Sequence, residues 1–226
     1  MSGTTLAARM TPSAERMVRF TDRIDAGRRL AQALAHLEGE AVVVLGVPRG
    51  GVEVAAEVAA VRGWPLDIVI PRKVGAPSNP ELGLGAIAPG IRVLDQRLIR
   101  SLNVSERYLE EEIAAQEEEI KRRTDAYRGG RPRVSVAGKV AVVVDDGVAT
   151  GGTAVAAVRW ARAAGASRVI LAIPVAPREA VARLSKEADE VVALATPEPF
   201  FAVGQWYERF PQTSDREVVE LLERAG

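Results

Sequence analysis

The stretch Val142-Val143-Val144-Asp145-Asp146-Gly147-Val148-Ala149-Thr150-Gly151-Gly152-Thr153 runs from β-branched residues through two acids into a turn of Gly and Thr. The valines predict a buried strand, and the Ala-rich residues after Thr153 predict a helix. Glycines let backbone N–H groups approach an anion closely, and the N-terminus of a helix carries a positive partial charge. We therefore expect a strand, a turn and a helix that bind a sugar phosphate, with the two acids beside ribose hydroxyls and a hydrated magnesium ion.

Apolar runs on both sides of this stretch repeat the alternation of strand and helix. The first ordered element is an amphipathic helix from Asp22 to near Gly39, and continuous apolar runs then alternate with helical patterns. Strands that are apolar on both faces and alternate with helices indicate an α/β fold, a mostly parallel sheet flanked by helices. Ligands of such sheets bind at the carboxyl ends of the strands. The expected strands are 41–47, 66–70, 140–144, 169–173 and 191–195, and the expected helices between them are 52–61, 153–164 and 178–188.

Two stretches interrupt this alternation. Residues 71–90 contain four Pro and four Gly without periodicity, which predicts a long functional loop. Residues 105–128 are highly charged and have few apolar positions, so they predict a mostly solvated helix with Ser105 as its N-cap.

The composition indicates a single domain and excludes several kinds of site. The 226 residues include 30 basic and 30 acidic side chains, so no overall field draws the chain to nucleic acid or to a membrane. Cys is absent and His36 is the one histidine, which excludes thiolate chemistry and histidine metal clusters. No apolar run reaches the about 20 residues that span a bilayer, and the first residues lack the apolar middle of a secretory signal. We expect a cytoplasmic protein with a disordered leader, residues 1–18, and one domain, residues 19–226.

The two acids, Asp145 and Asp146, also allow a purely structural interpretation. Asp145 can cap the end of the strand and Asp146 can start an Asx turn, with the glycines making the corner. Residues 149–153 disfavour this interpretation, because hydroxyls and glycines at the start of a helix form an anion site. The segment is not a Walker loop, since no Gly-Lys-Ser/Thr follows, and it lacks the dinucleotide G-x-G-x-x-G pattern.

Three segments together resemble the type I phosphoribosyltransferase family. Residues 142–153 resemble its phosphoribosyl diphosphate signature, in which a hydrophobic strand leads to two acids and a Thr-Gly turn. Pro48-Arg49-Gly50-Gly51 resembles the family's pyrophosphate loop. Pro71-Arg72-Lys73-Val74-Gly75-Ala76-Pro77 resembles the adenine phosphoribosyltransferase form of the family's flexible catalytic loop. Either of the last two alone could be an ordinary strand end, but all three occur in the family's order.

The resemblance implies a magnesium-dependent pentosyltransferase. Such an enzyme transfers a phosphoribosyl group from phosphoribosyl diphosphate to a nitrogen acceptor, here a nucleobase, and releases pyrophosphate. The two acids would hold the ribose hydroxyls and, mostly through water, Mg²⁺, while the loop at 71–90 closes over the site. The resemblance also implies a homo-oligomer, a dimer, with a small hood, residues 196–226. The implied catalytic residues are Arg49, Arg72, Lys73, Asp145 and Asp146, and the implied donor-binding residues are Arg49, Gly50, Gly51, Asp145, Asp146, Ala149, Thr150, Gly151, Gly152 and Thr153.

The sequence motifs indicate the acceptor substrate less clearly than the donor substrate. Residues 199–207, Pro-Phe-Phe-Ala-Val-Gly-Gln-Trp-Tyr, resemble the hood of 6-oxopurine phosphoribosyltransferases, where an aromatic ring stacks on the base. Phe200, Phe201 and Trp206 are therefore base-stacking candidates, although the same rings could form a small local core. The chain has Ala149 where oxopurine enzymes carry an acid, and Ala76 in place of the Lys-Leu of the adenine enzymes. These departures leave the acceptor open.

A second hypothesis is a sensor that binds phosphoribosyl diphosphate or a nucleotide and regulates nucleic acid. The zero net charge disfavours this hypothesis, and so do the acidic triplets beside the basic residues of 121–133. We therefore do not expect nucleic acid as a partner. A third hypothesis, a phosphohydrolase or a structural relic of the fold, ranks lower. The basic residues that would contact nucleic acid are Arg9, Arg16, Arg19, Arg23, Arg28 and Arg29 in one cluster and Lys121, Arg122, Arg123, Arg128, Arg131 and Arg133 in the other.

Overall fold

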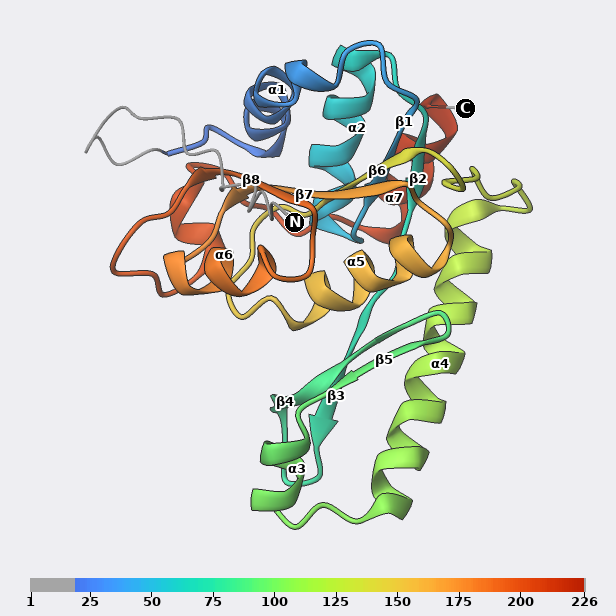
Figure 1. Cartoon of the computed structure of the whole chain (residues 1–226), viewed down its shortest axis with the longest axis vertical. Helices are drawn as coiled ribbons and strands as arrows, with labels where there is room; N and C mark the ends of the chain where they lie inside the picture. The colour runs from blue at the N-terminus through green and yellow to red at the C-terminus, as the bar shows by residue number, and fades with distance from the viewer. Residues whose placement is uncertain (1–18, 226) are drawn as a thin grey trace, which may run out of the picture.

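Five parallel strands in the order β2-β1-β6-β7-β8 form the central sheet (Figure 1). The computed structural model describes residues 19–225, so the predicted leader, with Arg9 and Arg16, lies outside the described residues. The central sheet and its flanking helices confirm the predicted α/β fold. The strands are β1 (Val42–Gly46), β2 (Leu66–Ile68), β6 (Val140–Val144), β7 (Arg168–Val175) and β8 (Glu190–Ala195).

Helices cover both faces of this sheet. α1 and α2 lie on one face, and α5 and α6 lie on the other (Figure 1). α1 begins after its N-cap Asp22, as predicted, but it ends at Ala33 rather than near Gly39. The chain tightens there into the 3-10 turn η1, which brings Leu37 into the core. The bounds are α1 (Arg23–Ala33), η1 (Ala35–Leu37), α2 (Gly50–Arg62), α5 (Gly152–Ala163) and α6 (Arg178–Leu184).

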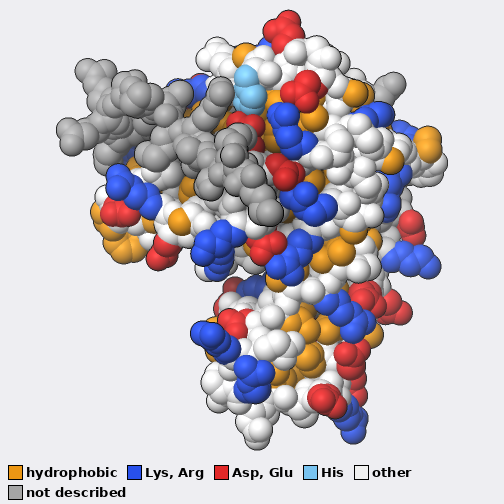
Figure 2. Space-filling model, viewed as in Figure 1, with side chains coloured by type: hydrophobic (Ala, Val, Ile, Leu, Met, Phe, Trp, Pro, Cys, Tyr) orange, Lys and Arg blue, Asp and Glu red, His pale blue; other side chains and the backbone are white. Residues whose placement is uncertain are grey.

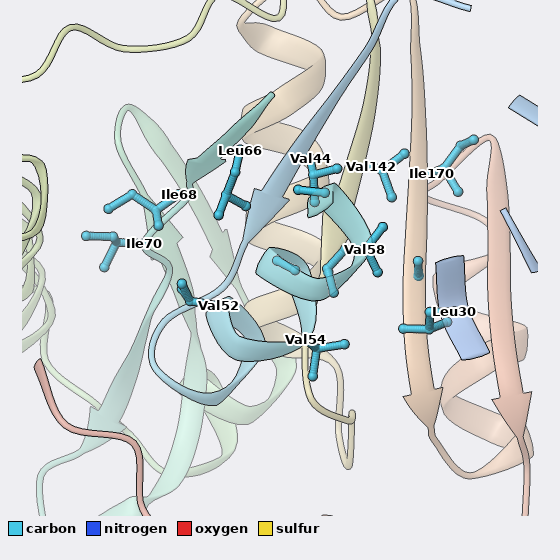
Figure 3. Packing of buried hydrophobic residues seen from close by; sticks show 14 of the residues in the cluster. Leu30, Val44, Val52, Val54, Val58, Leu66, Ile68, Ile70, Val142 and Ile170 are labelled. Atoms are coloured by element: carbon cyan, nitrogen blue, oxygen red, sulfur yellow. The ribbon is translucent and has the colours of Figure 1, made fainter. Parts of the chain in front are cut away.

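The core on each side of the sheet is made by alternate residues of the same strands. Figure 3 shows Val44 of β1 and Val142 of β6 beside Val58 of α2. Their neighbours Val43 and Val143 belong to the second core cluster, which includes the buried residues of α5. Every residue of β1 and β6 is buried. Burial on both faces is the reason that these strands are continuous apolar runs in the sequence.

An antiparallel arm follows the second strand of the sheet (Figure 1). The arm, residues 72–128, consists of the three-stranded sheet β3-β4-β5, the short helix α3 and the long helix α4, so the predicted loop without regular structure at 71–90 is wrong. Period-two alternation is not visible there because the pairing of β3 with β4 shifts register around Gly75, and Gly85 takes a φ of 157°. The bounds are β3 (Arg72–Ala76), β4 (Asn79–Ala88), β5 (Ile91–Leu94), α3 (Gln96–Ser101) and α4 (Glu106–Arg128).

The charged segment at 105–128 forms α4, as predicted. The Ser105 hydroxyl oxygen accepts a hydrogen bond from the Tyr108 N–H and caps the helix. Its buried residues are Ile113, Ile120 and Tyr127, which join the core, while most of the other side chains are exposed or half-buried. The helix is therefore solvated along most of its surface.

The predicted hood, residues 196–226, contains two elements that lie in different places. η2 (Val203–Trp206) lies beside the start of the described chain, because the Phe20 N–H donates to the Trp206 carbonyl at 2.8 Å. α7 (Asp215–Arg224) packs against α2 and α4 instead. On the visible surface, basic and acidic side chains are interspersed (Figure 2). None of the helices between residues 19 and 225 is both long and apolar enough to cross a bilayer.

Candidate functional site

The carboxyl ends of β1 and β6 are neighbours at the centre of the sheet. From this pair the strand order continues to β2 on one side and to β7 and β8 on the other. In open parallel sheets, the crevice at such a reversal of strand order is where ligands bind. The arginine turn, residues 48–51, follows β1, and the acid pair, Asp145 and Asp146, follows β6. Both predicted binding segments therefore lie at this crevice.

The arginine turn packs directly against the acid pair. A Cβ atom at Gly50 would collide with the Asp146 carboxylate, and one at Gly51 would lie 2.9 Å from Asp145 Oδ1. Only the absence of a side chain lets the two segments approach this closely. The structure thus brings together four of the predicted donor-binding residues from two segments far apart in the sequence.

Burial and mutual repulsion make the acid pair unequal. Burial raises the pKa of the Asp145 carboxyl well above its usual range, and the neighbouring Asp146 charge raises it further. Burial also raises the pKa of Asp146, but the charge of the Arg23 guanidinium opposes that rise. Arg23 Nε donates to Asp146 Oδ2 at 2.8 Å, whereas Asp145 accepts a hydrogen bond from the Asp146 N–H at 2.9 Å. Asp145 is therefore the acid that holds a proton more readily.

Arg23 is a residue of this site that the sequence did not predict there. It was expected in a surface cluster, yet it is only 5% exposed, which corrects that expectation. The sequence did contain a signal, because Arg23, Gly27 and Leu30 share one face of α1 and all three are buried. A charge on a buried face needs a buried partner, and Asp146 is that partner.

The phosphate turn, residues 149–153, leads into the N-terminus of α5. Gly151 is the N-cap of α5. Its φ of 78° is one that residues with a side chain rarely adopt. No acidic residue lies in the first turn of α5, so an anion there would meet the helix N–H groups without a competing carboxylate. Ala149 and Thr150 are exposed and Thr153 is half-buried. The turn therefore presents backbone donors and hydroxyls to solvent at the crevice.

Two arginines border these turns. Arg49 is half-buried, and its Nη1 atom lies 3.7 Å from Asp215 Oδ1 of α7. The peptide bond between Pro48 and Arg49 is cis. Arg183 of α6 was not predicted, and its guanidinium lies against Gly151 of the phosphate turn. No motif surrounds Arg183 in the sequence, so only the packing of α6 beside the turn identifies it.

Arg72 and Lys73 lie in β3, and their present partners belong to the arm. Arg72 Nε donates to Gln116 Oε1 of α4 at 2.8 Å. Burial, followed by the positive charge of Arg123, lowers the pKa of the Arg72 guanidinium. Lys73 Nζ donates to Glu81 Oε2 of β4 at 3.0 Å. Within the described part of the chain, neither side chain forms a hydrogen bond or ion pair with the acid pair.

The aromatic residues of the hood differ in how free their rings are. Phe200 and Trp206 are stacked with centroids 6.3 Å apart, and Trp206 is buried in a local core with Tyr207. Phe201 is 81% exposed, so its ring is the free one. The hood reaches the site through the Tyr207 hydroxyl, which donates to the Asp146 main-chain oxygen at 2.5 Å.

The acid pair fits magnesium bound mostly through water. Residues 19–225 contain no group of three or more acids or histidines that could enclose a metal ion. In the same residues, no N–H or hydroxyl donates to Asp145 Oδ2 or Asp146 Oδ1, and the two carboxyl groups are close enough to share a proton. Mg²⁺ usually keeps several waters and binds through one or two carboxylates plus substrate oxygens. Two neighbouring carboxylate oxygens without an N–H or hydroxyl donor match that pattern.

Comparisons with known proteins show the family to which the chain belongs. Residues 19–205 match the family model described as phosphoribosyl transferase domain. Two Mycobacterium tuberculosis proteins, named "Putative phosphoribosyl transferase Rv0571c" and "Putative phosphoribosyl transferase MT0597", are each 53% identical over 207 residues, which is 91% of this chain and 47% of theirs. The chain thus spans about half the length of these curated relatives. The crystal structure of TT1426 from Thermus thermophilus matches with a TM-score of 0.78 and 48% identity, over 91% of this chain and 98% of that chain. The chain therefore belongs to the phosphoribosyl transferase domain family.

Proposed function

We propose that the protein binds phosphoribosyl diphosphate with Mg²⁺ and transfers the phosphoribosyl group to a nitrogen acceptor, a nucleobase, with release of pyrophosphate. The contact between the arginine turn and the acid pair, at the carboxyl ends of β1 and β6, carries this proposal. The arginine turn offers N–H groups and a guanidinium to pyrophosphate, and the acid pair offers carboxylates to ribose hydroxyls and Mg²⁺. The phosphate turn offers an anion site to the 5-phosphate. Each part of one ligand thus has a matching group around one crevice.

In the proposed reaction, the bond from ribose C1 to the pyrophosphate oxygen breaks and a bond from C1 to an acceptor nitrogen forms with inversion. Pyrophosphate leaves with the electron pair, and the acceptor nitrogen loses its proton. The protein contributes orientation of the ribose by the acid pair and of the 5-phosphate by the phosphate turn. When bound, Mg²⁺ supplies positive charge to the leaving pyrophosphate. Arg49, next to Gly50, adds positive charge on the same group.

The arm supplies the remaining two catalytic candidates of the proposal. To reach pyrophosphate, Arg72 would release Gln116 and Lys73 would release Glu81. The second exchange costs little, because Lys73 and Glu81 form an exposed ion pair and such pairs contribute about 0–1 kcal/mol. Closure of this segment over the site would exclude water from the oxocarbenium-like C1.

The acceptor side of the proposal depends on Phe201. Its free ring can stack on a planar base, whereas the Trp206 ring is already covered by Phe200. Ala149 provides no acid to handle a proton of an oxopurine. The test therefore uses a panel of purine and pyrimidine bases rather than one acceptor.

A binding measurement and a turnover measurement together test the proposal. With Mg²⁺, phosphoribosyl diphosphate at about 100 times its Kd should stabilise the protein by about 2.7 kcal/mol and raise its Tm. Asp146→Asn should remove this shift and lower base-dependent pyrophosphate release about 100-fold. Asp125→Asn, on the exposed surface of α4, is the matched control and should behave as wild type. A wild-type Tm that the diphosphate leaves unchanged, or undiminished turnover by Asp146→Asn, would contradict the proposal.

A further inference from the structure

Arg23 is a buried arginine whose guanidinium contacts three other segments of the chain. It is the first residue of α1. Its Nε donates to Asp146 Oδ2 at 2.8 Å, and its Nη1 donates to the main-chain oxygen of Pro211 at 2.7 Å. Glu53 Oε1 of α2 lies 3.7 Å from Nη1, and the centroid of the Phe210 ring lies 3.9 Å from the guanidinium carbon. A buried charge with partners in several directions is held in one position, because each lost contact leaves polar groups unpaired in a poorly solvated place.

Asp146 is fixed by the same surroundings. Its Oδ2 accepts from Arg23, its N–H donates to Asp145 and its carbonyl accepts from Tyr207. Gly50 of the arginine turn packs against the same Oδ2 atom. No donor in residues 19–225 hydrogen-bonds to Oδ1. Arg23 therefore engages one oxygen of the carboxylate and leaves the other without an N–H or hydroxyl donor.

The contacts of Arg23 extend into a buried polar cluster. Glu53 also accepts a hydrogen bond from the Thr213 hydroxyl, and Thr213 is itself buried. The cluster joins the start of α1, the first turn of α2, the acid pair and residues 210–213. Since Asp146 touches Gly50, a shift within this cluster would also change the distance between the acid pair and the arginine turn.

We propose that Arg23 is a positioning residue that holds the Asp146 carboxylate in one orientation, so that Oδ1 meets the ribose hydroxyls of phosphoribosyl diphosphate or the magnesium ion bound with it. This inference rests on the proposed function. In other binding sites, residues that hydrogen-bond to a ligating carboxylate fix its orientation, and their loss typically lowers affinity or activity about 10- to 100-fold. If Arg23 had only a structural role, its substitution would change stability and would not raise the donor KM more than the acceptor KM.

Two substitutions at Arg23 test the inference. Arg23→Lys keeps the charge but lacks the planar fork that reaches Asp146 and Pro211 together, and Arg23→Met keeps most of the length without the charge. With Mg²⁺ present, we expect the Kd of phosphoribosyl diphosphate and the donor KM to rise about tenfold in Arg23→Lys and about 100-fold in Arg23→Met, with the acceptor KM unchanged. Calorimetric titration gives the Kd, and pyrophosphate release gives the two KM values. Arg28→Met is the matched control, since Arg28 also joins α1 to α2 through Glu57 but is exposed, and it should bind the donor as wild type does.

The outcomes separate this inference from the proposed function. If Arg23→Met does not fold, Arg23→Lys decides alone. Folded Arg23 variants with wild-type donor affinity would overturn the inference and leave the proposed function standing. Equal rises in donor and acceptor KM would also overturn it, because they indicate a general loss of structure. A wild-type protein that binds no phosphoribosyl diphosphate would overturn the proposed function and this inference with it.

Discussion

At the scale of single residues, the acid pair has fewer cationic partners than carboxylates. Asp145 and Asp146 are adjacent and half-buried, and Arg23 pairs with Asp146 alone. Two neighbouring carboxyl groups that have a single cationic partner cannot both ionise freely. Burial, followed by this imbalance, raises the pKa of Asp145. Such an imbalance is typical of a site that receives a further cation with its ligand.

Asp145→Asn should therefore stabilise the ligand-free protein above the acidic range. The pKa of Asp145 is higher in the folded than in the unfolded chain, so the folded state binds the proton more tightly. The free energy of unfolding therefore falls as the pH rises from the unfolded-state pKa to the folded-state pKa. Asn keeps an oxygen for the Asp146 N–H and removes the charge. At about pH 8 the Tm should rise by a few degrees, since 1 kcal/mol shifts it by about 2–4 °C in a chain of this size.

The same substitution should show little advantage at about pH 3, where the carboxyl is mostly protonated in the folded and in the unfolded state. Thermal unfolding of the two proteins at several pH values measures this difference. A Tm of Asp145→Asn at or below that of wild type at about pH 8 would show that the carboxylate does not destabilise the fold.

At the scale of elements, α4 is anchored to the body of the protein at its C-terminal end. Tyr127 is fully buried in the last turn of α4, and its hydroxyl donates to Asp215 Oδ1 of α7 at 2.7 Å. The next residue, Arg128, pairs with Asp67 of β2 at 3.0 Å. Asp215 also lies 3.7 Å from the Arg49 guanidinium. The base of the arm is therefore in contact with the arginine turn through one carboxylate.

The Tyr127 anchor should make the protein sensitive to alkali. Burial, followed by the hydrogen bond to Asp215, raises the pKa of Tyr127 to about 12. The unfolded chain ionises this tyrosine near pH 10, so between about pH 10 and pH 12 the folded state binds the extra proton. The free energy of unfolding therefore falls as the pH rises through that range.

Tyr127→Phe should reduce this pH dependence. The substitution keeps the ring in the core and loses one hydrogen bond, which costs about 1 kcal/mol at neutral pH. Urea unfolding of both proteins between about pH 9 and pH 12 should show a shallower decline for Tyr127→Phe. If the free energy of unfolding declined equally with pH in both proteins, ionisation of Tyr127 would not be the cause of the alkaline sensitivity.

At the scale of the whole molecule, charge is balanced and locally paired. The chain has 30 basic and 30 acidic residues, and Figure 2 shows both signs interspersed on the visible face. In the second predicted basic cluster, Arg122 and Arg123 pair with Glu119, and Arg128 pairs with Asp67. Three of the six basic residues in that cluster therefore already have acidic partners, which reduces the positive charge that is free to bind a polyanion.

We therefore expect no binding of nucleic acid at physiological salt. Non-specific affinity comes from free cations that neutralise phosphates and release counterions. A mobility-shift titration with single-stranded RNA and duplex DNA at about 0.15 M salt should show no complex at micromolar protein. A complex that weakens steeply with added salt would instead favour the sensor hypothesis.

The pattern of strands and helices in the central sheet could be predicted because each strand is buried on both faces and is therefore a continuous apolar run. The arm could not, because Pro and Gly at 71–90 hide strands whose pairing shifts register around Gly75. The end of α1 was also misplaced, since tertiary burial of Leu37 and not helical periodicity determines how the chain turns there.

By itself, the sequence determined which segments follow β1 and β6, and the rules of parallel sheets then place the arginine turn and the acid pair at the same edge of the sheet. The pairing of β1 with β6, which only the structure shows, makes them neighbours. Only the tertiary structure decided what surrounds that pair. Arg23 comes from α1 and Tyr207 from the hood, and both reach Asp146 because Phe20 pairs with the chain at Tyr207. Such contacts depend on how distant segments pack in three dimensions. Local periodicity can place Arg23 on the buried face of α1, but it does not identify the partner that Arg23 meets there.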